Sequence, residues 1–154
     1  MFQFRGWAQA LVLATIVIST MRAADSTDPW KKSELMTVVE LKGRLPDVKS
    51  GKALLIHVGF RKLYAQGYIP GSHYAGPGNK PEGLADFKKL VEKIPHNREI
   101  IIYCGCCPWD VCPNIRPAFR ALKQMGFTNI KAVEFPNALV SDWAAKGFPL
   151  TRGE

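Results

Sequence analysis

Residues 99–113 read EIIIYCGCCPWDVCP, an apolar run that leads directly into four cysteines within nine residues. Three consecutive isoleucines before Tyr103 are typical of a strand that is buried on both faces, as in a parallel sheet. Cys104 then begins the loop at the carboxyl end of this strand. Because open α/β sheets bind their ligands at that edge, the run predicts both a parallel sheet and the place of a functional site.

Helical and extended patterns alternate along the rest of the chain. We expect further strands at residues 53–58, 74–75 and 130–135, and helices at 37–45, 60–66, 81–95, 114–125 and 139–146. The chain has 154 residues, of which 47% are apolar, enough for one domain with its own core. The predicted fold class is therefore α/β, a single domain with a central, mostly parallel sheet and helices on both faces.

Residues 54–72 read LLIHVGFRKLYAQGYIPGS and resemble the first signature of the rhodanese-like domains. That signature is an apolar strand followed by Asp-Val-Arg, Glu-Tyr and Gly-His-Ile-Pro-Gly-Ala, and its core matches at Tyr64, Gly67 and 69–71. Residues 100–104 resemble the second signature, a strand that leads into the catalytic cysteine, and 126–127 and 143–149 resemble two later landmarks. The resemblance covers residues 36–152. It implies a sulfurtransferase in which Cys104 takes sulfur from thiosulfate or a related donor as a persulfide and passes it to a thiophilic acceptor.

The chain also departs from the family pattern. The family's Asp, Arg, Glu and His are replaced by His57, Gly59, Leu63 and Tyr68, and its paired glycines before the last helix by Pro136-Asn137. The loop at 105–113 is longer than in rhodaneses and carries three additional cysteines. The CGCCPWDVCP run looks like a distinct bacterial subgroup, for which the fold alone does not establish activity.

Sulfur transfer needs a thiolate, whereas a cysteine of ordinary pKa is mostly protonated at neutral pH. We expect Cys104 to be the nucleophile, stabilised by main-chain N–H groups of the surrounding loop and by the start of the next helix. The alternative is a buried structural cysteine. This chemistry requires no cofactor, and none is predicted.

Three residues are candidates for substrate binding. Arg116 lies near the predicted helix start, where it can bind an anion, although a solvated arginine would have the same sequence pattern. His57 ends the neighbouring strand and can tune the thiolate, or it can be a satisfied core histidine. Trp109 can contact substrate or simply cover the loop.

Cys106, Cys107 and Cys112 are candidates for a second sulfur site or for resolving a persulfide as a disulfide. Three alternatives remain open. Cys104 and Cys107 have the Cys-x-x-Cys spacing of thiol–disulfide redox proteins. Four clustered cysteines can also bind a soft metal, Zn(II) or Cu(I), although no metal is assigned to the sulfur-transfer site. The loop can also be a non-catalytic binding module stiffened by a disulfide.

The N-terminus is predicted to be a signal peptide at residues 1–24, followed by a linker at 25–35 and the domain at 36–152. Arg5 precedes an apolar run at 8–21, and small residues follow at Ala23 and Ala24. An uncleaved membrane anchor is the alternative. The prediction places the protein in the periplasm or outside the cell, with no membrane contact after cleavage.

The chain is basic, with a formal net charge of +8. Such a charge can steer small anions. The predicted partners are a small sulfur-containing anion and a thiol acceptor. Because exported thiols oxidise readily, a thiol reductant protein is a further candidate partner. No basic run interleaved with aromatic residues points to nucleic acid.

Overall fold

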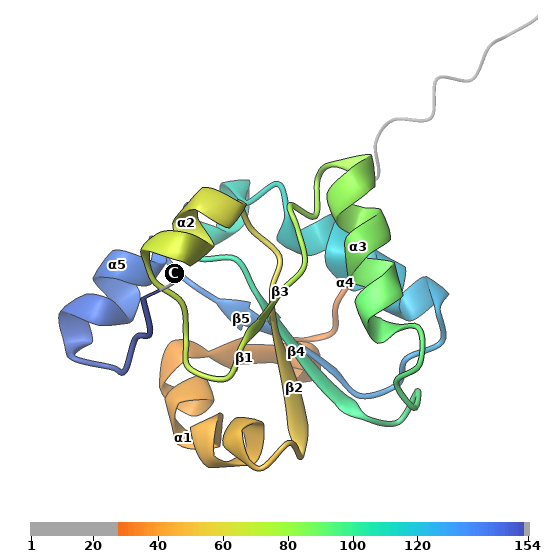
Figure 1. Ribbon diagram of the computed structural model, residues 1–154, viewed down its shortest axis with the longest axis horizontal. Helices are drawn as coiled ribbons and strands as arrows, with labels where there is room; N and C mark the ends of the chain where they lie inside the picture. The colour runs from red at the N-terminus through yellow and green to blue at the C-terminus, as the bar shows by residue number, and fades with distance from the viewer. Residues whose placement is uncertain (1–27, 153–154) are drawn as a thin grey trace, which may run out of the picture.

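The computed structural model describes residues 28–152, so the predicted signal peptide lies outside the described residues. These residues form a five-stranded sheet with the strand order β1-β5-β4-β2-β3 (Figure 1). Every neighbouring pair of strands is parallel. The strands are β1 (Leu35–Thr37), β2 (Ala53–His57), β3 (His73–Tyr74), β4 (Glu99–Tyr103) and β5 (Ile130–Glu134). The predicted α/β class with a parallel sheet is confirmed.

Helices cover both faces of the sheet, as predicted (Figure 1). On one face α3 (Pro81–Val91) and α4 (Ile115–Gln124) pack against Ile100 and Ile102. On the other face α1 (Val38–Lys49) and α5 (Leu139–Asp142) pack against Ile101 and Tyr103. Successive residues of a strand point to opposite faces, so burial on both sides explains the uninterrupted apolar run. The short helix α2 (Arg61–Gln66) follows β2.

The first strand was not predicted, because three residues are too few to show a hydrophobic period. Leu35–Thr37 pairs with β5, and a 3-10 turn at Lys32–Glu34 precedes it. Regular structure therefore begins within the segment that the sequence suggested as a linker. Thr37 and Glu40 form a capping box at the start of α1, with Glu40 N donating to Thr37 Oγ1 over 3.2 Å.

The ends of three helices differ from the prediction. Helix α1 continues through Pro46 to Lys49 instead of ending at residue 45, because Val48 beyond the proline is buried in the core. Tertiary packing here outweighs the hydrogen bond that proline cannot donate. Helix α3 ends at Val91, and α5 ends at Asp142 before a separate 3-10 turn at Ala144–Lys146.

The pairing of β2 with β4 decides where the site lies. His57 is opposite Tyr103, so both strands end at the same edge and their following loops begin side by side. Val58 N donates to the Tyr103 carbonyl over 2.8 Å, which holds the two loop starts together.

None of the helices in the described part of the chain has the length and hydropathy of a membrane span.

Candidate functional site

Cys104 is the first residue after β4, and its side chain is only 4% exposed. Its Sγ lies 2.9 Å from Cys106 Sγ. Gly105 between them has a φ of 66°, and a Cβ at this position would lie 2.8 Å from Leu139 Cβ. Only glycine fits this left-handed turn without strain, and the turn brings the two sulfurs together.

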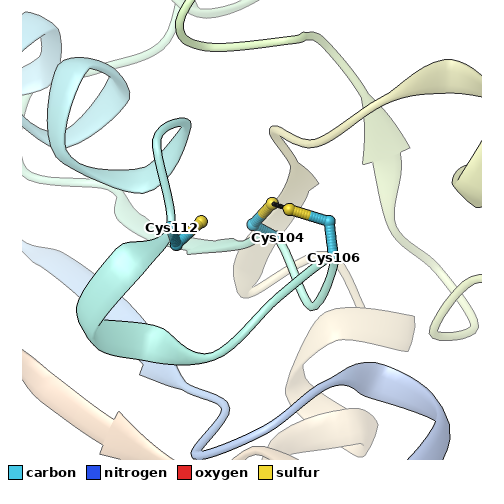
Figure 2. Close-up of side chains that lie close together, drawn as sticks. All are labelled: Cys104, Cys106 and Cys112. Atoms are coloured by element: carbon cyan, nitrogen blue, oxygen red, sulfur yellow. Dashed lines mark hydrogen bonds between the residues drawn. The ribbon is translucent and has the colours of Figure 1, made fainter.

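Cys112 reaches the same point from the other end of the loop. It follows a 3-10 turn at Trp109–Val111 and is buried. The Sγ atoms of Cys104, Cys106 and Cys112 all lie within 4.8 Å of one another (Figure 2). Cys107 Sγ lies 3.2 Å from Cys106 Sγ, and all four cysteines are free thiols. The structure thus brings together the cysteines that the sequence singled out, with three sulfurs at the centre.

Asn114 is a site residue that the sequence analysis missed. It occupies the N-cap position of α4, as expected, but its side chain makes no capping hydrogen bond. Its Nδ2 instead donates to Cys104 Sγ over 3.4 Å and to Cys106 Sγ over 3.6 Å, while Oδ1 accepts from Asn79 N. The available signal in the sequence was an asparagine two residues after the last cysteine, and only the structure shows that its side chain is buried against the sulfurs.

The charge on the sulfurs is distributed differently from the prediction. The hydrogen bond with Cys106, the neighbouring Cys112 and burial all raise the pKa of the Cys104 thiol. The pKa of Cys112 is lowered by the neighbouring Cys104 and Cys106 thiols and by the backbone N–H groups of Asn114 and Ile115. Main-chain N–H groups were expected to stabilise a thiolate at Cys104, but here they stabilise the thiolate of Cys112. The reason is the loop insertion, which places Cys112 rather than Cys104 directly before α4.

His57 ends β2 and is 1% exposed. Burial lowers its pKa to about 4, so its imidazole is neutral at pH 7. Its Nδ1 accepts a hydrogen bond from Gly59 N over 3.3 Å. A Cβ on Gly59 would lie 2.8 Å from His57 Cε1 and 2.9 Å from Cys104 Sγ. The position of the family's arginine therefore leaves no room for a side chain in this arrangement.

A pocket of about 190 Å³ opens beside Cys104. Its lining includes His57, Leu63, Cys106, Leu139 and Leu150. No lysine or arginine of the described residues lines it. The pocket therefore presents a largely apolar surface next to the sulfur.

Arg116 donates to the loop at residues 104–113, and Trp109 is part of that loop. Arg116 Nε is 2.8 Å from Asp28 Oδ1, and Nη1 donates to the carbonyls of Trp109 and Cys112 over 3.4 Å. Trp109 packs on Trp30 with ring centroids 4.7 Å apart. Neither residue lines the 190 Å³ pocket, and a contact of either with substrate stays a prediction.

This chain carries a cysteine in the loop that follows the central parallel strand, and a helix begins at the same edge of the sheet. This arrangement defines a class of α/β domains with a thiol site. The family model for the rhodanese-like domain matches residues 37–134, and the chain belongs to this family. No curated protein matches the sequence.

Solved structures share the fold at low identity. The rhodanese-like domain of the Alr3790 protein from Anabaena is 20% identical, with a TM-score of 0.55 over 77% of this chain and 79% of that one. The BH2092 protein from Bacillus halodurans is 20% identical, with a TM-score of 0.57 over 78% and 77%. A Rhodopseudomonas palustris protein described as a possible tyrosine phosphatase is 15% identical, with a TM-score of 0.53 over 77% and 84%. At these identities the likeness shows the fold alone.

Proposed function

We propose that this chain is a sulfurtransferase that carries a sulfane sulfur as a persulfide on Cys104. The observation that carries the proposal is the place of Cys104. It lies at the carboxyl end of the central strand of a rhodanese-like domain, its Sγ receives the Asn114 amide, and a pocket opens next to it. An open pocket beside a buried sulfur gives a donor access to that sulfur.

The reaction begins with a proton transfer inside the cluster. At rest, negative charge is favoured on Cys112 and disfavoured on Cys104, so this transfer runs uphill: Cys112 takes the proton of Cys104 and leaves the thiolate on Cys104. The Cys104 thiolate attacks the outer sulfur of thiosulfate, the S–S bond of thiosulfate breaks, and sulfite leaves with the electron pair. Asn114 Nδ2 stabilises the charged sulfur through a charge-assisted hydrogen bond.

The second half of the reaction returns the enzyme to its starting state. A thiol acceptor attacks the outer sulfur of the Cys104 persulfide, which releases the Cys104 thiolate and forms a persulfide on the acceptor. The lining of the pocket by Leu63, Leu139 and Leu150 favours an acceptor that presents an apolar group to the site.

The test is intact-mass analysis of the reduced, chelator-treated full chain after exposure to thiosulfate. We expect a gain of one sulfur atom that cyanide removes as thiocyanate. Cys104→Ser abolishes the gain, whereas Cys107→Ser, the matched change in the same loop, retains it. If the wild type gains no sulfur from thiosulfate or from a small-molecule persulfide, the proposal is wrong.

A second candidate is thiol–disulfide exchange, which the 2.9 Å contact between Cys104 and Cys106 favours. The sequence suggested Cys104 and Cys107 as the redox pair, whereas the sulfur contact observed is with Cys106. Mild oxidation followed by peptide mapping tests this candidate. A Cys104–Cys106 disulfide that a dithiol reverses would support it, and four free thiols after oxidation would eliminate it.

A further inference from the structure

We infer that Cys104, Cys106 and Cys112 form a binding site for a thiophilic d¹⁰ cation, Zn(II) or Cu(I). The inference rests on the arrangement of the three sulfurs and does not depend on sulfur transfer. It adds a ligand class that the persulfide chemistry does not use. Thiolates are the protein ligands that select these ions over hard cations such as Mg²⁺ and Ca²⁺.

The distances between the sulfurs fit a single shared ion. A Zn–S bond of about 2.3 Å in tetrahedral geometry places two sulfur ligands about 3.8 Å apart. The three Sγ atoms lie within 4.8 Å of one another, and the shortest separation is the 2.9 Å between Cys104 and Cys106. The required value lies between the shortest separation and this upper limit, so sulfur displacements of about one ångström suffice to equalise the distances.

The backbone holds these sulfurs from two independent directions. Cys104 and Cys106 flank the left-handed turn at Gly105, whereas Cys112 approaches from the segment that leads into α4 (Figure 2). Ligands from both ends of a loop allow an ion to close that loop, so that the free energy of binding also stabilises the fold.

The surroundings favour an ion without its water shell. Cys104, Cys107 and Cys112 border a void of about 10 Å³, which is otherwise lined by apolar side chains such as Trp109, Ile115 and Phe135. Cys106 does not border this void, so the void is not the position of the ion; its size shows only that no hydrated cation fits beside Cys104 and Cys112 on this side. The buried amide of Asn114 donates to two of the three sulfurs, which is the outer-sphere support that thiolate ligands receive in metal sites.

The three-sulfur set leaves one coordination position for zinc and none for trigonal copper. The 190 Å³ pocket borders both Cys104 and Cys106, so a fourth ligand can enter as an exogenous thiol or water. Because the ion would occupy Cys104 Sγ, metal binding and persulfide formation exclude each other. The metal-loaded chain is then inactive in sulfur transfer until a chelator removes the ion.

The test is an anaerobic titration of the reduced full chain with Zn(II) and, separately, with Cu(I), each in competition with a chromophoric chelator. We expect one ion per chain. Cys104→Ser, Cys106→Ser and Cys112→Ser should each weaken binding by at least about tenfold. Cys107→Ser is the matched control and retains wild-type affinity. Equal weakening by all four substitutions would overturn the three-sulfur assignment.

A second measurement keeps the test independent of the folding of the variants. In the wild-type chain, the bound ion should protect three thiols from alkylation and leave Cys107 reactive, as counted by intact mass and mapped by peptide. Unprotected thiols, or no binding of either ion above that of a variant lacking all three cysteines, would overturn the inference. Sulfur loading is assayed separately on metal-free protein, so either proposal can fail while the other holds.

Discussion

Two segments leave the sheet side by side and differ in almost every chemical respect. We call residues 57–74, from the last residue of β2 through β3, the aromatic segment, and residues 104–113, which follow β4, the cysteine loop. The aromatic segment surrounds a neutral imidazole with the rings of Tyr64, Tyr74 and Tyr103, the last contributed by β4. The cysteine loop contains all four thiols of the chain.

The difference shows how this chain divides its site. The aromatic segment keeps the family's backbone pattern at Tyr64, Gly67 and 69–71, but the family's ionisable side chains at 59 and 63 have become Gly59 and Leu63. The cysteine loop departs in length and gains sulfurs. The aromatic segment thus contributes uncharged residues such as His57 and Leu63 to the pocket lining, while its cations Arg61 and Lys62 lie outside that lining. The cysteine loop contributes the thiols, and the predictions below test that division.

The largest expected effect concerns the uncharged His57 imidazole of the aromatic segment. His57 has its pKa lowered from 6.5 to about 4 in the folded chain because it is buried. The unfolded chain therefore binds a proton first as pH falls, so the contribution of His57 to stability is full above pH 6.5 and is lost as pH falls toward 4. We expect the free energy of unfolding to fall by about 3 kcal/mol from this group.

Urea unfolding of the wild type and of His57→Gln at a series of pH values measures this effect. The carboxyl groups titrate in both chains, so the difference between the two pH profiles isolates the imidazole. Parallel profiles would mean that the pKa of His57 is the same in the folded and unfolded chains, and the imidazole beside the pocket would then become charged as pH falls through about 6.5.

The next effect concerns Asn114, which serves the cysteine loop from the start of α4. Asn114→Leu removes the amide that donates to Cys104 Sγ and Cys106 Sγ. Loss of one preorganised donor to a reacting charged atom typically slows a reaction by about 100-fold. We expect sulfur loading to slow by that factor with an unchanged final extent. Asn79→Ala is the control, because only the backbone N–H of Asn79 contacts Asn114. Equal rates in the two variants would show that the amide is structural.

A smaller effect comes from the link between the two segments. The Tyr103 hydroxyl accepts from Ile69 N over 3.1 Å and lies 2.9 Å from Ser72 Oγ. Tyr103→Phe leaves both buried groups without this partner, so we expect a loss of about 2 kcal/mol of stability by urea unfolding. Tyr68→Phe removes a hydroxyl from a half-buried ring of the same segment and should cost less than about 0.5 kcal/mol. An unchanged stability in Tyr103→Phe would show that the Tyr103 hydroxyl does not help to hold the aromatic segment against β4.

The same division explains what the sequence could predict. The isoleucines of β4 and the alternation of strands and helices predicted the sheet, because a strand buried on both faces needs apolar residues at successive positions. The same apolar run predicted that Cys104 lies at the carboxyl edge of the sheet. No comparable sequence pattern predicts the path of the cysteine loop, because that path depends on the left-handed turn at Gly105 and on how far residues 106–112 fold back. The donors at Cys112 and the inward turn of Asn114 could therefore be seen only in three dimensions.

The smallest expected effect is at Arg116, which the sequence offered as an anion ligand. Its guanidinium pairs with Asp28, lies over the ring of Trp30 at 5.3 Å and donates to two carbonyls of the cysteine loop. The Asp28 side chain is 46% exposed, so the ion pair should contribute less than about 1 kcal/mol. We expect Arg116→Ala to leave KM for thiosulfate unchanged in a cyanide-coupled assay and to lower stability slightly. A large rise in KM with unchanged kcat would mean that the guanidinium leaves Asp28 to bind the donor. Arg116 would then be a cationic binding residue beside the cysteine loop.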